Sequence, residues 1–267
     1  MSKIDFIKNK YSISVLILLV CMGVDILLHR GMSRVMLPAS FTQRITPYLL
    51  KPFHREIRIT EKAWDKAINS TEAVSRLDTK TPGFECDVYF DTSKHTFYVY
   101  HDSLRISHTT MDEILHAYKK QGLTASLWLD MKNLSNVNCA AANKEVDRLR
   151  DLFGMSGKMI IESSVPSCLE SFYNSGYFTS YYVPFFNPYQ EEEHKIISMI
   201  DSIAAVLKKY PACALSGYYF QYPALKKFFP NYPVLTWADR SWVSIVSLTF
   251  NHQLMNDSMV KVILYNK

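Results

Sequence analysis

The stretch Gly83-Phe-Glu-Cys-Asp-Val-Tyr-Phe-Asp91, with its return Phe97-Tyr-Val-Tyr-His-Asp102, decides the fold. We expect a strand, a short turn and a returning strand, on which successive side chains alternate between two faces. Glu85 and Asp87 then share one face, and Cys86 takes the other. Two carboxylates that close repel each other, so one takes up a proton or a cation lies between them. The stretch therefore predicts a cation site on a strand; a polar edge strand with an ordinary surface histidine is the alternative.

A second apolar run, Ser126-Leu-Trp-Leu-Asp-Met-Lys132, also ends in charged residues. As a strand it places Trp128, Asp130 and Lys132 on one face. The C-terminal ends of parallel strands are where barrel enzymes keep their chemistry. We therefore expect Asp130 and Lys132 to lie near the first carboxylate pair, with His101 beside them.

The order Glu-x-Asp-Val, a short turn, His-Asp and then Leu-Asp-x-Lys resembles the glycerophosphodiester phosphodiesterases. These belong to the wider phospholipase-C-like phosphodiesterase superfamily. The upstream run Trp64-Asp-Lys-Ala-Ile-Asn-Ser70 is more similar to the menorin-type branch of that group. The resemblance covers roughly residues 60 to 267 and implies a (β/α)8 TIM barrel that hydrolyses a phosphodiester.

The pattern after Lys62 independently favours the same fold, because short apolar runs alternate with amphipathic segments. The candidate strands are 63–68, 83–90 with its return 96–101, 126–131, 158–163, 178–183, 212–218, 233–238 and 260–265. Helices are expected between most of them: one from the capping box Thr110-Met-Asp-Glu113, one over 138–153 that stops at Gly154, and one over 189–209. Eight such units predict a parallel barrel. Its closing helix would be absent or supplied by residues 32–58.

The most apolar segment of the chain is 12–28, and three lysines precede it. A basic start followed by an apolar run is typical of a signal or signal-anchor. We predict a membrane-anchor helix within 1–31, a linker or accessory segment over 32–59, and the barrel over 60–267, outside the cytoplasm. A cleaved signal or a buried helix remains an alternative, since Asp25 places a charge near the far end of the run.

Composition narrows the partners further. The chain has 267 residues and a net charge of +5, but no basic run with interleaved aromatic residues. We therefore expect no nucleic-acid partner. The expected partner is a small-molecule or lipid-head-group phosphodiester, and the N-terminal segment adds a membrane. The five cysteines have no metal-like spacing.

The predicted metal ligands are Glu85, Asp87 and Asp130, which offer only oxygen. Oxygen ligands favour a hard cation, Mg2+ or Ca2+, over zinc. A metal bound to a phosphodiester draws charge from the non-bridging oxygens. Lys132 could add a fixed positive charge beside the phosphate.

The predicted acid–base residues are His101 and Lys66. In the resembled families two histidines divide the roles of general acid and general base. His101 matches the second of them, and Lys66 stands in the place of the first. A lysine keeps a positive charge but is a poor proton shuttle unless its pKa is strongly lowered. Either the enzyme works with an altered acid–base pair, or the site is a degenerate one that binds a phosphorylated glycan or lipid head group without cleaving it.

Four further positions have weaker signals. Asn69 and Trp237 are assigned to substrate binding. Trp237 resembles the family's aromatic residue near the seventh strand and could stack on the substrate, with a packed core position as the alternative. Glu162 could line the barrel mouth or cap the next helix. His29-Arg-Gly31 matches the triplet that opens the glycerophosphodiesterase motif. Its distance from Glu85 is too long, so we interpret it as a charge cluster at the membrane flank.

Overall fold

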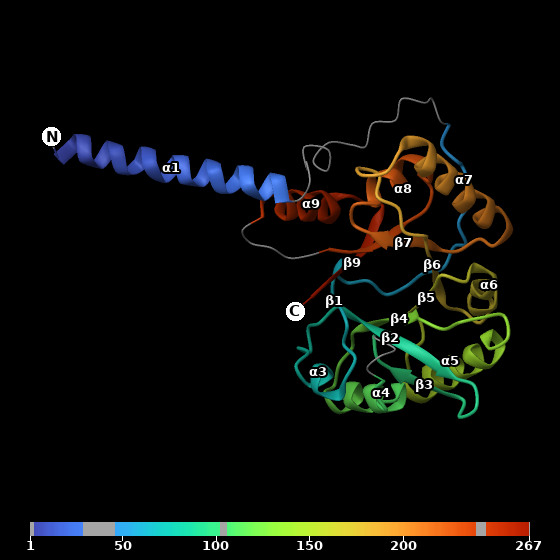
Figure 1. Cartoon of the computed structure of the whole chain (residues 1–267). Helices are drawn as coiled ribbons and strands as arrows, with labels where there is room; N and C mark the ends of the chain where they lie inside the picture. Colours follow the sequence, from blue (N-terminus) through green and yellow to red (C-terminus); the bar gives the residue numbers. More distant parts are fainter. Residues whose placement is uncertain (1–2, 29–45, 102–105, 239–243, 267) are drawn as a thin grey trace.

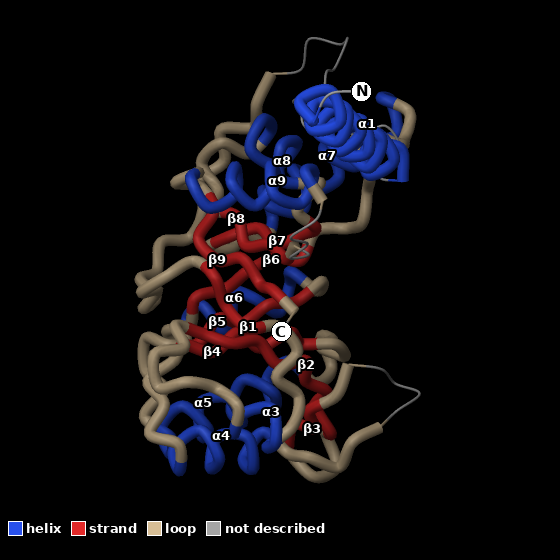
Figure 2. Tube along the Cα trace, turned by 90° about the vertical axis from the view of Figure 1, so that its left-hand side faces the viewer, coloured by secondary structure: helices blue, strands red, loops and turns tan. Residues whose placement is uncertain are grey.

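The computed structural model describes residues 3–28, 46–101, 106–238 and 244–266. The triplet His29-Arg-Gly31 and half of the predicted linker, residues 32–45, lie outside these ranges. Within them, strands and helices alternate along the chain from residue 63 onward. Helices α7 to α9 lie on one side of the strands and α3 to α5 on the other (Figures 1 and 2).

Eight strands of the described chain form a closed parallel barrel. In chain order they are β1 (Ala63–Asp65), β2 (Gly83–Asp91), β4 (Ser126–Met131), β5 (Met159–Ser163), β6 (Phe178–Tyr182), β7 (Ala214–Tyr218), β8 (Val234–Trp237) and β9 (Val260–Tyr265). Each pairs in parallel with its neighbours, and β1 closes the ring between β9 and β2. The predicted (β/α)8 barrel is therefore confirmed.

A hairpin extends β2 beyond the barrel, as the sequence predicts. Strand β3 (Thr96–Val99) returns antiparallel to β2. The Asp91 carboxylate accepts hydrogen bonds from the backbone N–H groups of Ser93 and Lys94, which is the local chemistry of an Asx turn. His95 completes the turn in the left-handed region, with φ at 50°. β3 ends two residues before His101, so the hairpin delivers that histidine toward the barrel mouth.

The predicted helix signals are found where the sequence places them. Helix α4 (Met111–Lys120) begins at the full Thr110–Glu113 capping box, and α5 (Cys139–Phe153) ends at Gly154, whose φ of 64° suits glycine. Helix α7 (Glu193–Lys209) begins four residues later than predicted. The remaining helices of the barrel region are α3 (Thr71–Ser75), α6 (Pro166–Asn174), α8 (Tyr222–Phe228) and α9 (Ile245–Asn256).

Residues 46–62, which we call the strap, run under the N-terminal end of the barrel. The described part of the predicted linker, residues 46–59, holds no helix, so it does not supply a closing helix. The backbone N–H of Phe53 donates to Ala212 O at 2.9 Å, and that of Arg58 donates to Gly157 O at 2.9 Å. The apolar side chains of the strap pack against the residues that fill the barrel interior. The strap therefore closes the barrel at the end opposite the C-terminal mouth.

The predicted anchor segment forms helix α1 (Lys3–Leu28), which lies to one side of the barrel near α9 (Figure 1). Asp25 Oδ2 accepts a hydrogen bond of 2.9 Å from the backbone N–H of Ile245 at the start of α9. Apolar side chains between Ile13 and Val24 are exposed. Among the residues described, no helix has the length and apolar character needed to cross a membrane.

The seam between β1 and β2 depends on a glycine, and we expect Gly83→Ala to destabilise the protein by about 3 kcal/mol. A Cβ at this position would lie 2.2 Å from Trp64 Cδ2 and 2.3 Å from Cε2. The indole is only 1 % exposed, so it cannot move aside freely. Urea unfolding measures the effect. Gly23→Ala is the control, because a Cβ there meets nothing within 4 Å. Equal unfolding midpoints for the two variants would contradict this account of the seam.

Candidate active site

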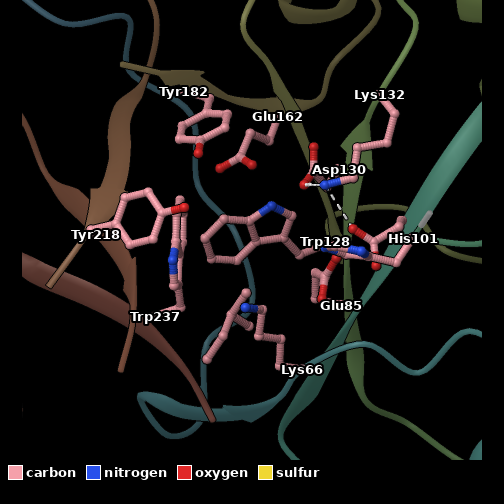
Figure 3. A pocket seen from close by; sticks show the side chains of 12 residues that line it. Lys66, Glu85, His101, Trp128, Asp130, Lys132, Glu162, Tyr182, Tyr218 and Trp237 are labelled. Carbon is pink, nitrogen blue, oxygen red and sulfur yellow. Dashed lines mark hydrogen bonds and ion pairs between the residues drawn. The ribbon is translucent and has the colours of Figure 1, made fainter. Parts of the chain in front are cut away.

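A pocket of about 90 Å³ opens at the C-terminal end of the barrel (Figure 3). Each barrel strand, or the residue that directly follows it, contributes to its wall. The lining residues are Lys66, Glu85, Asp87, His101, Trp128, Asp130, Lys132, Glu162, Tyr182, Tyr218, Trp237 and Leu264. All predicted catalytic and metal-binding residues therefore meet in one pocket, together with the predicted aromatic residue Trp237.

Three carboxylates form the acidic half of this pocket. One oxygen from each of Glu85, Asp87 and Asp130 lies within 4.8 Å of the other two. The face alternation on β2 brings the first two together, and parallel register places Asp87 directly beside Asp130. Cys86 points the other way into the core, where its Sγ lies 3.0 Å from Ile68 O.

Asn69 holds the central carboxylate by two hydrogen bonds. Its Nδ2 donates to Asp87 Oδ2 at 2.6 Å, and its Oδ1 accepts from the Asp87 backbone N–H at 3.0 Å. The sequence predicts a substrate-binding role for Asn69, but Asn69 is not among the residues that line the pocket. The geometry places its amide where it orients Asp87.

Ala67, a strained residue just after β1, hydrogen-bonds the Glu85 carboxylate. Ala67 has φ at 58°, a left-handed conformation that costs a residue with a Cβ about 1 kcal/mol or more. This turn aims the Ala67 N–H at Glu85 Oε2, 2.7 Å away. The same turn sets the direction in which Lys66 leaves the strand. The local strain therefore positions two pocket residues at once.

Lys132 bridges the carboxylates from the outer side. Its Nζ forms an ion pair of 2.7 Å with Asp87 Oδ1 and a second ion pair with Asp130. Burial lowers the pKa of Lys132, but the charges of Asp130 and Asp87 outweigh this effect and raise it above the ordinary value. The ammonium therefore stays charged at the edge of the acidic half.

The charge balance of the acidic half fits a divalent cation. Burial, followed by the charges of Asp87 and Asp130, raises the pKa of Glu85 from 4.5 to about 8. Burial likewise raises the pKa of Asp130, and the charge of Lys132, together with its hydrogen bond to Asp130, offsets part of that rise. With one lysine beside three carboxylates, two of them buried, carboxylate groups outnumber ammonium groups. Three oxygen donors within 4.8 Å of one another suit Mg2+ or Ca2+.

The raised pKa of Glu85 predicts how stability varies with pH in the metal-free protein. The folded state keeps the Glu85 proton up to about pH 8, whereas the unfolded chain releases it near 4.5. The free energy of unfolding should therefore fall as pH rises through this window, by up to about 4 kcal/mol. Urea unfolding in EDTA from pH 5 to 8 measures the fall.

Glu85→Gln, which imitates the neutral acid, isolates the Glu85 contribution from those of Asp130 and Glu162. The variant should lose most of the pH dependence and keep the stability that wild type has near pH 5. Parallel pH profiles for wild type and variant would show that Glu85 ionises freely in the folded protein.

The opposite half of the pocket is aromatic. The rings of Tyr182 and Tyr218 meet the Trp237 ring edge to face, with centroids 5.3 and 4.9 Å away. Lys66 extends from below, and its Nζ lies 5.7 Å from the centroid of the Trp237 ring. Trp237 therefore lines the pocket and is not only a packed residue of the hydrophobic core. Tyr182 carried no signal in the sequence, because only its place at the end of β6 brings it here.

Glu162 lies between the two halves (Figure 3). It is 1 % exposed, and burial, with a further contribution from Asp130, raises its pKa well above the ordinary value. Helix α6 has Val165 as its N-cap residue and no side-chain cap hydrogen bond, so Glu162 does not cap it. Of the two interpretations of Glu162 from the sequence, the structure supports the one at the barrel mouth.

Among the described histidines, His101 alone lines this pocket. His54 belongs to the strap and lines a separate cavity under the barrel, with residues such as Pro52 and Lys261. It cannot replace the missing first histidine of the resembled families. The resemblance in the sequence places Lys66 at the position of that histidine, and this correspondence stays a prediction.

Comparison with known proteins identifies the fold. No protein family model and no curated protein matches the sequence. Solved structures do match. A glycerophosphodiester phosphodiesterase of Parabacteroides distasonis is 14% identical, with a TM-score of 0.53 over 81% of this chain and 94% of that one. A phosphodiesterase of Oleispira antarctica, solved with the product sn-glycerol-3-phosphate, is 12% identical, with a TM-score of 0.51 over 76% of this chain and 92% of that one.

At these identities the likeness concerns the fold. The chain shares the barrel of the glycerophosphodiester phosphodiesterases over nearly their whole length, which confirms the resemblance found in the sequence at that level. The closer similarity to the menorin-type branch stays a prediction.

Proposed function

We propose that the protein is a metal-dependent phosphodiester hydrolase of the glycerophosphodiesterase type. The observation that carries the proposal is the convergence of four carboxylates, two lysines and one imidazole of the described residues on a single pocket at the C-terminal end of the barrel, with three of the carboxylates close enough to share a cation. The shared fold with known phosphodiesterases supports it. The substrate is a small-molecule phosphodiester, derived from a lipid or linked to a glycan.

The residues divide the work according to their positions. A divalent cation held by Glu85, Asp87 and Asp130 would stabilise the negative charge on the non-bridging oxygens of the phosphate. The ammonium groups of Lys132 and Lys66 enter the pocket from different sides and can attract the same phosphate. His101 can give a proton to the leaving alcohol or take one from the nucleophile. Asn69 keeps Asp87 oriented.

Hydrolysis of bis(p-nitrophenyl) phosphate by the full-length protein tests the proposal. Release of p-nitrophenol should require added Mg2+ or Ca2+ and should stop in EDTA. Glu170→Gln, an exposed position on α6, serves as the control and should keep full activity. The absence of metal-dependent release would remove the hydrolase proposal.

A second function, binding without cleavage, is favoured by the single imidazole and by Lys66. The Lys66 ammonium faces the Trp237 ring at 5.7 Å, in the place where the resembled enzymes keep a histidine. If the chain only binds its phosphorylated ligand, wild type should be inactive. Lys66→His should then gain metal-dependent turnover above wild type. If wild type is active, the same substitution tests whether Lys66 shares the acid–base work.

Membrane attachment through residues 12–28 and an extracytoplasmic barrel are further proposals. The exposed apolar side chains of α1 support an apolar partner for this helix. We expect the full-length protein to sediment with membranes and to be released by detergent, not by high salt. Recovery in the soluble cytoplasmic fraction would refute this placement.

A further inference from the structure

Two buried polar atoms face the pocket without a partner. Trp128 Nε1 and Glu162 Oε2 make no hydrogen bond within the described part of the chain. Their residues are 0 % and 1 % exposed. Figure 3 shows the indole in the middle of the pocket, with the Glu162 carboxylate above it. Buried polar groups are almost always paired, so these two unpaired groups point to a missing partner. The Ser216 hydroxyl lies beside Glu162 and is itself buried without a hydrogen-bond partner among the described residues.

An aromatic surface continues from these two atoms to the rim of the barrel. The Tyr218 ring, which meets Trp237 inside the pocket, stacks on Phe220 with centroids 5.1 Å apart and an interplanar angle of 15°. Phe185 packs edge to face against Tyr218 and is 58 % exposed. A ligand that enters beside the acidic half therefore meets flat apolar surfaces along its other side.

The chemistry of the two unpaired atoms restricts this ligand. The Glu162 carboxyl group needs a donor when it is ionised and an acceptor when it is protonated, and the Trp128 N–H needs an acceptor. A hydroxyl group supplies both. An ammonium group supplies only donors, so it would leave the indole N–H unpaired, and an acyl chain supplies neither. The aromatic rings add a preference for a ring with an apolar C–H face.

We infer that the aromatic half of the pocket is a subsite for the sugar ring of a glycosyl phosphodiester, with Glu162 and Trp128 binding its hydroxyl groups. The inference rests on the proposed function and specifies its substrate class. The phosphate would lie on the acidic side, and the ring would lie toward Tyr182 and Trp237.

Binding in the presence of Mg2+ tests the inference by calorimetry, without any turnover. The ligands are inorganic phosphate, glycerol 3-phosphate, phosphocholine, glucose 1-phosphate and mannose 1-phosphate. The tighter of the two hexose phosphates should bind about tenfold or more tightly than each of the other three. Glu162→Gln and Trp128→Phe should each reduce the ratio of hexose-phosphate to phosphate affinity by about tenfold. Glu170→Gln should leave the ratio unchanged.

Each outcome separates the inference from the proposed function. If phosphate and hexose phosphate bind equally well, the sugar subsite is wrong and the hydrolase proposal stands. If phosphocholine binds more tightly than the hexose phosphates, the aromatic side chains bind a cation and not a sugar. If glycerol 3-phosphate binds as tightly as the hexose phosphates, the ligand needs no sugar ring. Either result overturns the inference. If no ligand binds, subsite and phosphate site fail together. Because the ranking is measured on wild type, the test stands even if a variant does not fold.

Discussion

Asp87→Asn should abolish the stabilisation of the protein by Mg2+ or Ca2+ and, with it, metal-dependent hydrolysis. Asp87 is the central carboxylate: it pairs with Lys132 at 2.7 Å, and Asn69 orients it. Asparagine keeps the shape of the side chain but brings no negative charge to the ion. Wild type at about 100 times the dissociation constant gains about 2.7 kcal/mol of stability. The variant should gain almost none.

Melting temperature against added Mg2+ or Ca2+ measures this difference. Asp151→Asn is the matched control, since this exposed carboxylate on α5 pairs with Arg150 and lies outside the pocket. The control should shift with metal as wild type does. If wild type itself shows no shift with either ion, the metal site is wrong.

His101→Ala should lose turnover by a factor of about 10²–10⁴, the usual effect of removing an acid–base group. It should nearly keep the metal-dependent stabilisation, because the carboxylate cluster does not include His101. The side chain is exposed at the barrel mouth, so little folding stability depends on it. Steady-state rates and melting curves on the same preparation separate the two effects.

His108→Ala is the control for the second prediction. His108 follows the same hairpin and contacts the Tyr98 ring, with centroids 6.3 Å apart, outside the active pocket. It should keep wild-type turnover. A His101→Ala protein that also loses its metal response would make His101 a ligand. One that keeps full turnover would remove it from the chemistry.

Local patterns in the sequence were sufficient to predict the acidic half of the site. Alternation along β2 places Glu85 and Asp87 on one face, and the apolar run of β4 ends in Asp130 and Lys132. These relations depend on residues two positions apart or on adjacent strands. The strand positions followed from equally local patterns of apolar runs and helix caps.

Contacts between distant parts of the chain could not be predicted in this way. Lys66 meets Trp237 only because β1 and β8 belong to one closed ring. Trp128 Nε1 and Glu162 Oε2 have no hydrogen-bond partner among the described residues because none of the neighbouring strands places a suitably oriented polar group against them, and this depends on the whole barrel. The strap contacts scattered residues at the barrel end, so its sequence shows no periodic pattern and predicts only a linker. The sequence indicates that Asn69 belongs to the site, but only the fold shows that its amide hydrogen-bonds Asp87.

The short first strand has a consequence for how the protein is made. β1 forms three register pairs with β9 and one with β2. Its main partner is therefore synthesised about 200 residues later than β1 itself, since Ala63 pairs with Ile263. A nascent chain cannot close its ring until the last strand leaves the ribosome, and non-local pairing of this kind is slow. Until then the exposed edges of β2 and β8 can pair with strands of other chains. Growing chains are therefore prone to aggregate, which is the situation in which chaperones act.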